Sequence, residues 1–513
     1  MRSTPGALAA LATVAAHLAA ALVPRDAPEA AAVAAAAVAT APPTTAAMAL
    51  PFPAQVAIDD SNLAMCANAN WPPTSTGVGE VISAQLPDAD LQAALKEVDP
   101  ARLRATVEKL VGFGTRHTMS TQTDPKRGIG AARDWIAQEM RGYAQAAGGR
   151  MEVTVPGYVQ GVASRISFPV LISNVVATLK GDKDPDRVYV ISGHYDSRAT
   201  DVMNFEIDAP GANDDASGVA LAMELARIFA TRRPAATIVF TAVAGEEQDL
   251  FGSRFMAQTF RNASVNVEGV LNNDIIGSST GSRGEKDPHT VRVFCQGGSP
   301  PGEPKDRAET RADIGGENDS PARELGRFVA EVGANSFTDM KVALVYRLDR
   351  YLRGGDHSSF LDAGYGSAVR FTEPNENFNH QHQDVGKAPD GTVLGDLPEF
   401  VDYDYVARVA KVNLATAWSL ANAPPQVRNV TVDTEDLSND TALSWAKIAG
   451  PAAALVKGYE VVWRPTTASM WTHQLFVGDV TSVKVPLTKD NVIFGVRSVG
   501  QNGYKSPATL PFP

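Results

Sequence analysis

The sequence predicts an α/β fold, a mixed and mostly parallel sheet sandwiched by helices, followed by a C-terminal β-sandwich. Two observations carry this prediction. In the middle of the chain, short apolar runs typical of buried strands alternate with helical patterns, which favours a parallel sheet covered on both faces. After residue 420 the helical patterns stop and short runs of alternating apolar residues follow, separated by turn signals. That pattern is typical of an all-β module.

The bulk composition agrees with a multidomain enzyme. The chain has 513 residues, more than a single hydrophobic core usually supports, so two or three domains are expected. It is 44% hydrophobic and 20% charged, as globular enzymes are. The formal charge is -12 and no long basic run occurs. We therefore exclude nucleic acid as a partner, because neutralising phosphates requires clustered Lys and Arg.

The first fifty residues differ in kind from the rest. Arg2 precedes an apolar stretch, and sequence rich in Ala, Pro and Thr follows it. We interpret 1–23 as a secretory signal peptide and 24–60 as a low-complexity spacer or pro-segment. The mature protein is then expected to be secreted or periplasmic, without a stable membrane span. A membrane anchor is the alternative, which the weakly apolar alanines and His17 disfavour.

Cysteine usage limits the kind of metal site. The two cysteines, Cys66 and Cys295, can form one disulfide in an oxidising compartment, but nothing in the sequence fixes their proximity. Two spaced cysteines do not build a thiolate zinc site. Any metal must therefore be held by His, Asp and Glu.

Apolar spacing gives the elements of the catalytic region, expected at 95–421 behind an N-terminal segment, 61–94, that packs on it. Periods of three and four predict helices, and short apolar runs predict strands. The expected helices are 91–111, 130–146, 217–231, 251–259, 320–332 and 405–420. The expected strands are 151–155, 174–179, 187–192, 236–244, 267–271, 292–295 and 367–371.

The C-terminal module is expected at 425–513, after a linker that opens at Ala423-Pro-Pro. Trp445 and Tyr459 match core positions of a fibronectin type III domain, which this module resembles; another seven-strand β-sandwich is the alternative. No catalytic cluster lies in it, so a surface or a polymer is its expected partner. Every candidate ligand precedes the linker, so residues 1–420 are expected to keep the metal site and the activity.

Candidate metal ligands follow the ends of the apolar runs. His194 and Asp196 come directly after one expected strand, and ligands of open α/β sheets bind outside the carboxyl ends of strands. His-x-Asp suits a metal-binding imidazole whose other nitrogen is oriented by a carboxylate. A single histidine at a strand end is more often structural, so the other motifs decide.

Three acidic turns extend the pattern. Two consecutive aspartates precede a helix where one N-cap would suffice, so Asp214 is a candidate bridging carboxylate. Glu246 and Glu247 follow an apolar strand and their side chains diverge, so Glu247 suits a ligand and Glu246 a general base. Asp274 is flanked by apolar residues, where an unpaired charge would be costly to bury and a metal would remove that cost. The run 379–384 supplies a last imidazole.

In the order His, Asp, Glu, Asp, His, with a Glu beside the third, these residues resemble the bacterial leucyl-type di-zinc aminopeptidases. The wider family includes aminopeptidase Y and glutamate carboxypeptidase II, and the resemblance covers 95–420. It implies an exported enzyme that removes N-terminal residues from peptide or protein substrates with two Zn2+ ions. The roles it implies are Asp214 bridging the ions, Glu247 and His380 completing one site, His194 and Asp274 the other, Glu246 as general base and Asp196 orienting His194.

Details near the last ligand follow from the same resemblance. The family's His-x-x-x-Asp spacing selects His380 rather than His382, because Asp384 lies four residues after His380. Some members place a tyrosine before this histidine, where Asn379 stands here. The segment Gly354-Gly-Asp356-His357-Ser-Ser-Phe resembles the family's Asp-His-x-x-Phe segment near the substrate pocket, so Asp356 and His357 are candidate substrate-binding residues.

Alternatives to an aminopeptidase stay open at this point. A related zinc carboxypeptidase or endopeptidase would use the same metal ligands. A transferase like glutaminyl cyclase would hold a single zinc, against which the full ligand set argues. A non-catalytic ectodomain, such as the transferrin receptor, would have lost ligands, and none is missing here.

Overall fold

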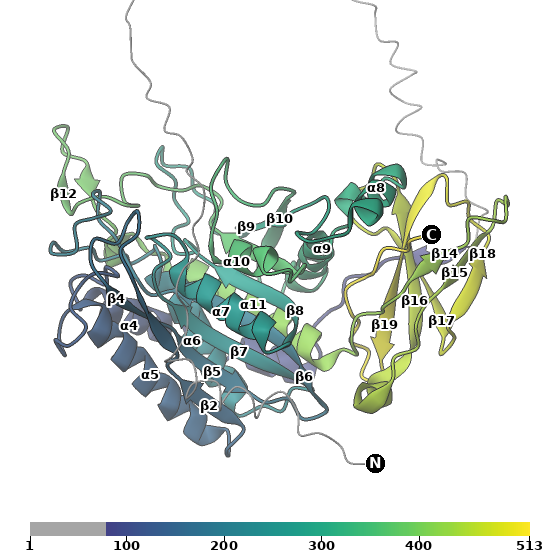
Figure 1. Ribbon diagram of the computed structural model, residues 1–513, viewed down its shortest axis with the longest axis horizontal. Helices are drawn as coiled ribbons and strands as arrows, with labels where there is room; N and C mark the ends of the chain where they lie inside the picture. The colour runs from purple at the N-terminus through teal and green to yellow at the C-terminus, as the bar shows by residue number, and fades with distance from the viewer. Residues whose placement is uncertain (1–77) are drawn as a thin grey trace, which may run out of the picture.

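The computed structural model describes residues 78–513, an α/β region beside a C-terminal β-rich region (Figure 1). The expected signal peptide (1–23), the spacer (24–60) and Cys66 lie outside the described residues. Cys295 is described and is a buried free thiol. Between residues 78 and 513, no helix is both long and apolar enough to cross a bilayer.

An eight-stranded sheet forms the centre of the α/β region, in the order β10-β9-β11-β8-β6-β7-β5-β2. Strands β7, β6 and β8 run parallel to one another, as do the pairs β11–β8 and β10–β9. Strand β5 is antiparallel to both of its neighbours, β7 and β2, and β11 is antiparallel to β9. The mixed, mostly parallel sheet confirms the predicted class. Its strands are β2 (Met151–Thr154), β5 (Val175–Leu179), β6 (Asp184–His194), β7 (Ala236–Val243), β8 (Asn266–Asn273), β9 (Thr290–Phe294), β10 (Lys341–Val345) and β11 (Ala368–Thr372).

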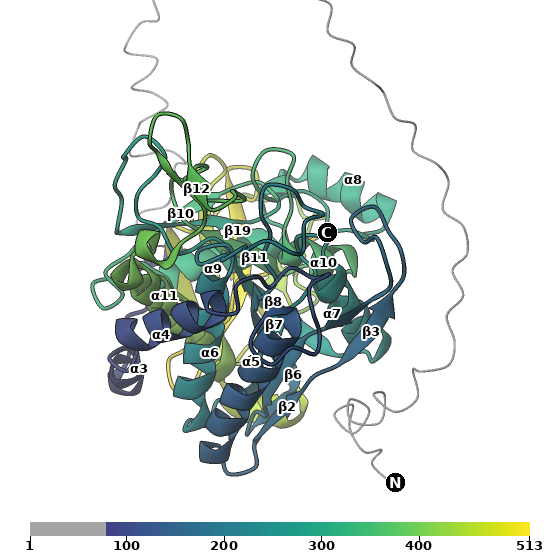
Figure 2. The same cartoon turned by 90° about the vertical axis from the view of Figure 1, so that its left-hand side faces the viewer.

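Helices cover both faces of this sheet (Figure 2). Successive side chains of a strand point to opposite faces. On β6, Tyr189 and Ile191 pack in the core shared with α4, α5, α6, α9 and α11, whereas Val188 and Val190 pack with α7 and α10. The helices are α3 (Ala89–Leu95), α4 (Pro100–Val111), α5 (Gly128–Ala146), α6 (Ala216–Ala230), α7 (Phe251–Asn262), α8 (Lys305–Asp313), α9 (Pro321–Gly333), α10 (Asp356–Asp362) and α11 (Tyr403–Asn422).

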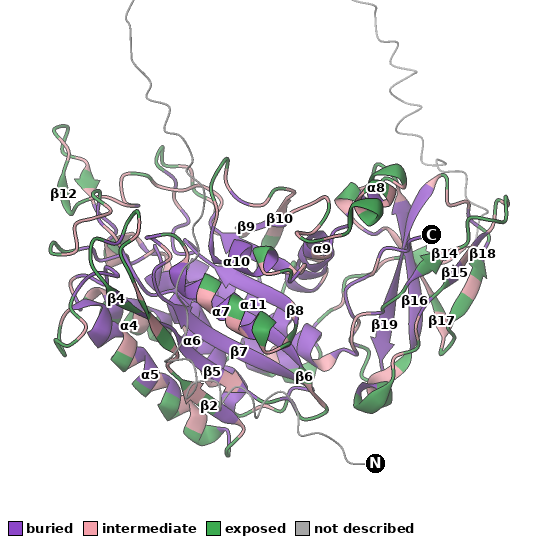
Figure 3. Ribbon diagram, in the orientation of Figure 1, coloured by how far each residue is buried: buried purple, intermediate pink, exposed green. Residues whose placement is uncertain are grey.

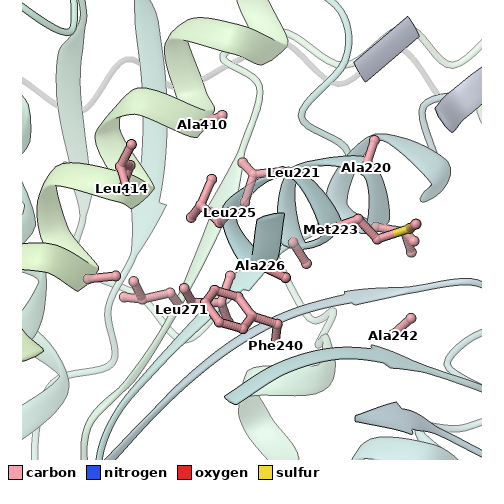
Figure 4. Packing of buried hydrophobic residues seen from close by; sticks show 14 of the residues in the cluster. Ala220, Leu221, Met223, Leu225, Ala226, Phe240, Ala242, Leu271, Ala410 and Leu414 are labelled. Atoms are coloured by element: carbon pink, nitrogen blue, oxygen red, sulfur yellow. The ribbon is translucent and has the colours of Figure 1, made fainter. Parts of the chain in front are cut away.

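Helix α6 lies at the centre of the larger core. Its Leu225 and Ala226 pack between Leu414 of α11 and Phe240 of β7 (Figure 4). Only Arg227 of its fifteen residues is not buried, and the strands below it are buried along most of their length (Figure 3). The start of α6, which directly follows the metal-binding candidate Asp214 and its neighbour Asp215, is therefore held against the sheet.

The C-terminal region is a β-sandwich, as predicted. Its two sheets have the strand orders β1-β17-β16-β19 and β14-β15-β18. Residues of both sheets share one core, with Leu443 and Val485 from one and Tyr459 and Val496 from the other. Its relation to fibronectin type III domains stays a prediction. The strands are β1 (Glu80–Val81), β14 (Thr431–Val432), β15 (Thr441–Ser444), β16 (Val456–Pro465), β17 (His473–Gly478), β18 (Ser482–Val485) and β19 (Val492–Gly500).

The described part of the N-terminal segment, from residue 78, contacts both regions. Strand β1 pairs with β17 of the sandwich, whereas α3 packs against α11 of the α/β region. The single helix expected at 91–111 is also divided into α3 and α4. The cause is Asp99, whose side chain accepts the amide hydrogen of Ala101 and caps α4, with Pro100 at its first position.

Several short elements were not predicted from the sequence. They are a hairpin of β3 (Gly157–Gln160) and β4 (Val170–Ser173), the pair β12 (Gly386–Lys387) and β13 (Val393–Leu394), strand β10, and helices α8 and α10. Three 3-10 turns, η1 (Gly316–Asn318), η2 (Pro398–Phe400) and η3 (Gly450–Leu455), complete the described chain.

The two regions meet through buried charges. Asp319, which precedes α9, accepts hydrogen bonds from Arg327 of α9 (2.9 Å) and from Arg464 of β16 (2.7 and 2.8 Å). Trp471 of the sandwich donates its indole hydrogen to Glu324 of α9 at 2.9 Å. The sandwich therefore packs on the α/β region through hydrogen bonds between buried side chains of the two regions.

Candidate metal centre

Three adjacent parallel strands deliver most of the candidate ligands to one edge of the sheet. Strand β6 ends at His194, β7 ends three residues before Glu246, and β8 ends one residue before Asp274. Because β7 and β8 both pair in parallel with β6, their carboxyl ends meet at this edge, where open α/β sheets bind ligands. The sequence prediction that these residues lie together is met by the geometry.

The loop before α6 adds Asp214, and its neighbour Asp215 has a different task. The Asp215 carboxylate accepts the backbone hydrogens of Gly218 (3.0 Å) and His194 (2.9 Å), so it caps α6 and ties it to β6. Asp396 accepts the backbone hydrogen of Asp214 at 2.7 Å and that of Asn213 at 2.8 Å. These contacts leave the Asp214 side chain to face the histidines.

The side chains form two groups that touch each other. In each group one ligand atom per residue lies within 4.8 Å of the others, and the members are His194, Glu246 and Asp274, and Asp214, Glu247 and His382. Asp214 joins the groups, because its Oδ1 lies 3.0 Å from His194 Nε2 and its Oδ2 lies 2.9 Å from His382 Nε2. His382 Nε2 also lies 3.1 Å from Glu247 Oε1.

The expectation for the last histidine is corrected by this geometry. His382, and not His380, lies beside Asp214 and Glu247. The His380 ring stacks on Phe400 with centroids 3.6 Å apart. The aspartate that suggested His380, Asp384, instead accepts the backbone hydrogen of Thr200 at 3.1 Å. The spacing of the resemblance does not hold here, and the chain turns at His382, where φ is +53°.

Asp196 lies beside His194, the residue that it is predicted to orient. Its Oδ1 is 3.5 Å from His194 Nδ1, and that nitrogen is also 3.1 Å from the Asp196 carbonyl oxygen. The same carboxylate accepts the backbone hydrogens of Glu246 and Glu247 at 3.2 and 3.1 Å. Asp196 therefore holds the glutamate turn as well as the histidine, which the sequence did not indicate.

The pair at the start of α10 is divided between two environments. Asp356 is buried, and neither of its carboxyl oxygens has a hydrogen-bond donor in standard geometry. Burial and the nearby carboxylates raise the pKa of Asp356 to about 7, although His194 opposes the rise. His357 is bound to the carbonyl oxygen of Leu348 at 2.9 Å, so Asp356 is the better candidate to contact a substrate.

The pKa values of Glu246 and His382 differ from those of ordinary surface groups. Burial raises the pKa of Glu246 well above its usual value, and Asp274 and Glu247 add to the rise. Burial alone would lower the pKa of His382, but Glu247 and Asp214 outweigh it and raise the value to about 10. His382 therefore lies in a strongly anionic environment.

These groups fit divalent cations. His194 Nε2 and Glu247 Oε1 are buried without a hydrogen bond of good geometry, although neighbouring oxygen or nitrogen atoms lie close to each. Nitrogen and oxygen atoms that lie close together without forming hydrogen bonds to one another are arranged as metal ligands are. Imidazole nitrogens and carboxylate oxygens are the donor types that zinc takes when cysteine is absent.

The α/β region contains two cavities, of which the smaller reaches the site. One of about 10 Å³, close to what a single water requires, is lined by Asp214, Glu373, Gln381 and Asp396 among others. The other, of about 600 Å³, is mainly apolar and its lining includes Met119. Of the ligands in the two groups, Asp214 lines the small cavity, and none lines the larger one.

Supporting residues were missed in the sequence analysis. Asp396 holds Asp214 from 182 residues away, a pairing that no local pattern reveals. Arg370 is fully buried on β11 and lies 3.0 Å from Asp274. A charged residue within an otherwise apolar strand pattern was the available signal for Arg370.

Comparison with known proteins agrees with this geometry. The model of peptidase family M28 matches residues 174–401. A probable zinc metalloprotease of Pyricularia oryzae is 86% identical over all of both chains. Another from Pyrenophora tritici-repentis is 60% identical over 90% of this chain and 94% of its own. These relatives are fungal, which corrects the expected likeness to bacterial enzymes.

Comparison with solved structures finds a partial likeness to two further proteins. LapB from Legionella pneumophila has a TM-score of 0.44 and 20% identity, covering 66% of this chain and 77% of its own. An aminopeptidase from Aneurinibacillus sp. strain AM-1 has a TM-score of 0.44 and 16% identity, covering 64% and 96%. Given its full-length relatives and the family match around the ligand cluster, the chain belongs to peptidase family M28.

Proposed function

We propose that the protein is an exported aminopeptidase that uses two zinc ions to remove N-terminal residues from peptides. The observation that carries the proposal is the sharing of Asp214 between two groups of ligands, at 3.0 Å from His194 and 2.9 Å from His382. A carboxylate with one oxygen toward each group is suited to bridge two cations. The relatives from Pyricularia and Pyrenophora are described as probable zinc metalloproteases, which supports zinc as the metal.

The ligands follow from the two groups. His194 and Asp274 would hold one ion, Glu247 and His382 the other, with Asp214 between them. Two zinc ions supply Lewis acidity, which polarises a scissile carbonyl and lowers the pKa of an attacking water. In contrast to Glu247, Glu246 is only partly buried, so its carboxylate can reach a substrate.

Glu246 is the proposed general base. Its burial-raised pKa makes the carboxylate a better proton acceptor than an ordinary surface glutamate. It would take a proton from the attacking water and transfer it to the amine that leaves. Asp196 holds the backbone of Glu246 at 3.2 Å, so the base is fixed relative to His194.

Asp356 is the proposed receptor for the substrate's free amine. A buried carboxylate with no hydrogen-bond donor in standard geometry is costly to leave incompletely paired, and an α-ammonium group would satisfy it. This contact would favour an exopeptidase that reads the N-terminus over an endopeptidase. A role of the sandwich in binding a surface or polymer remains a separate proposal.

Substitution of the base and a substrate panel test the proposal together. Glu246→Gln should keep both zinc ions, measured per chain by elemental analysis, and lose about 10²–10⁴-fold in turnover. Glu108→Gln, a half-exposed carboxylate on α4, is the matched control and should retain activity. Aminoacyl substrates with a free amine should be cleaved, and their N-acetylated forms should not. Equal cleavage of both forms would contradict an aminopeptidase, and loss of zinc from Glu246→Gln would contradict its role as base.

A further inference from the structure

A chain of buried ion pairs connects Asp274 to the segment that carries His382. Arg370 lies 3.0 Å from Asp274 Oδ1 and donates two hydrogen bonds to Asp349, at 2.7 and 2.8 Å. Arg350 contacts the same Asp349 at 3.3 Å and reaches Glu376 at 3.2 Å. These ion pairs therefore connect Asp274, in one proposed zinc site, to the polypeptide segment that carries His382, in the other.

Glu376 is the anchor at the far end of this chain. Its side chain is only 5% exposed and is surrounded by Arg292 at 3.0 Å, Arg350 at 3.2 Å and Arg353 at 3.8 Å. The three guanidinium groups come from β9 and from the loop between β10 and α10. They therefore fix Glu376 to strand β9 and to the loop that leads into Asp356.

The segment from Glu376 to His382 has no strand or helix to hold it. Its internal bonds are those of a turn, since the backbone hydrogens of His380 and Gln381 both go to the Asn377 carbonyl, at 3.0 and 3.1 Å. A turn that makes no strand hydrogen bonds is positioned by the tertiary contacts of its side chains. Glu376, six residues before His382, is the anchor with the most charged partners.

We propose that Arg350 and Glu376 are positioning residues that hold the His382 segment against the Asp274 side of the centre. The inference rests on the proposed function, because it assigns His382 to a zinc ion. Arg350 is the link, since it alone among these arginines contacts both Asp349 and Glu376. Formation of the zinc site that contains His382 thereby depends on the ion pairs that support Asp274 in the other site.

The test measures zinc affinity rather than activity alone. In full-length Arg350→Met and Glu376→Gln, competition with a chelator should show one zinc equivalent bound about 10–100-fold more weakly, as expected when an outer partner is lost. The other equivalent should keep its wild-type affinity, because His194 and Asp274 retain Arg370. Arg350→Lys keeps the positive charge and should recover part of the lost affinity.

Glu303→Gln is the matched control. The Glu303 side chain is 6% exposed and binds Arg311 at 2.6 Å and Arg307 at 3.3 Å, so its loss should destabilise the fold comparably. It contacts neither zinc group, and its zinc affinities should equal those of the wild type. The melting temperature of the metal-free proteins separates loss of stability from loss of metal.

Each outcome decides between the proposals. Wild-type zinc affinity at both sites in Arg350→Met and Glu376→Gln would overturn the positioning role and leave the proposed function intact. Wild-type protein that binds fewer than two zinc ions would instead contradict the proposed function. If Glu376→Gln does not fold, Arg353→Met, whose side chain is 39% exposed, should still weaken one equivalent. An unchanged Arg353→Met together with an unchanged Arg350→Met would overturn the inference.

Discussion

Two histidines, separated by one residue, have unlike surroundings at the last ligand position. His382 Nε2 lies within 3.1 Å of Asp214 and Glu247 oxygens, whereas the His380 ring stacks on Phe400. His382→Ala should therefore weaken one zinc equivalent by more than the roughly 10–100-fold that an outer partner is worth, and activity should collapse with it.

His380→Ala serves as the paired measurement. It removes an aromatic contact worth about 0.5–1.5 kcal/mol beyond its buried area, so the melting temperature should fall slightly while both zinc equivalents remain. Elemental analysis and chelator competition on the two variants give the comparison. Loss of zinc from His380→Ala with full retention in His382→Ala would show that the family spacing is correct after all.

Residues that follow a regular element were predictable, and those on irregular loops were not. His194, Glu247 and Asp274 each follow a strand whose apolar pattern is visible in the sequence, so their convergence could be inferred from the strands being parallel. His382 lies on a turn set by tertiary contacts such as that of Glu376. Asp396 and Arg370 act across distances in sequence that only the fold brings together.

At the scale of elements, backbone contact between β6 and α6 sets the spacing of the ligands. A Cβ added at Gly193 of β6 would lie 2.5 Å from the Gly218 carbonyl carbon of α6, and one added at Gly218 would lie 2.6 Å from Asp215 Oδ2. Neither glycine has room for a side chain. The close approach is what lets Asp215 bind the His194 backbone and places Asp214 beside the His194 ring.

Gly218→Ala should therefore push α6 away from the Asn273 carbonyl oxygen of β8, which would lie 2.3 Å from the added Cβ, and disturb the Asp215 cap. Overpacking of this kind costs about 1–3 kcal/mol, and the displaced Asp214 should weaken both zinc equivalents. Gly142→Ala on α5 is the control, because a Cβ there meets nothing within 4 Å. It should leave zinc binding unchanged and stabilise the helix by up to about 1 kcal/mol. Thermal melts and zinc competition would measure both, and an unaffected Gly218→Ala would contradict the close contact.

Long periodic elements were predicted well and short ones were missed, for physical reasons. Helix α6 and strand β7 bury nearly every residue, so their apolar patterns are strong and their ends came within one residue of the structure. Strand β10 is only partly buried and α10 has seven residues, too few for a period to be recognised. The loop between these two elements carries the ion pairs that support the metal centre.

At the scale of the whole molecule, the sandwich is part of the fold rather than an appended module. The linker at Ala423 is itself held, since Arg187 of β6 donates to its carbonyl oxygen at 2.7 Å. Arg497 of β19 binds Glu331 of α9 at 2.8 Å, and β1 joins the sandwich from the other end of the described chain. A Pro-rich boundary in the sequence carried no information about these contacts, which depend on surfaces formed only after folding.

The expectation that residues 1–420 would suffice for activity is therefore revised. Removing the sandwich takes Arg464 from Asp319 and Trp471 from Glu324, and breaking one buried ion pair typically costs about 3–5 kcal/mol. Whole domains are stable by only about 5–15 kcal/mol. Protein truncated after Asn422 should consequently aggregate or melt far below the full chain, and lose zinc because it unfolds.

Arg464→Met in the full chain should also lower the melting temperature, whereas Lys447→Ala, which removes an exposed pair with Asp479, should change it little. Truncated protein with the full chain's melting temperature and both zinc equivalents would show that the α/β region folds alone, and that the buried charges of α9 find other partners.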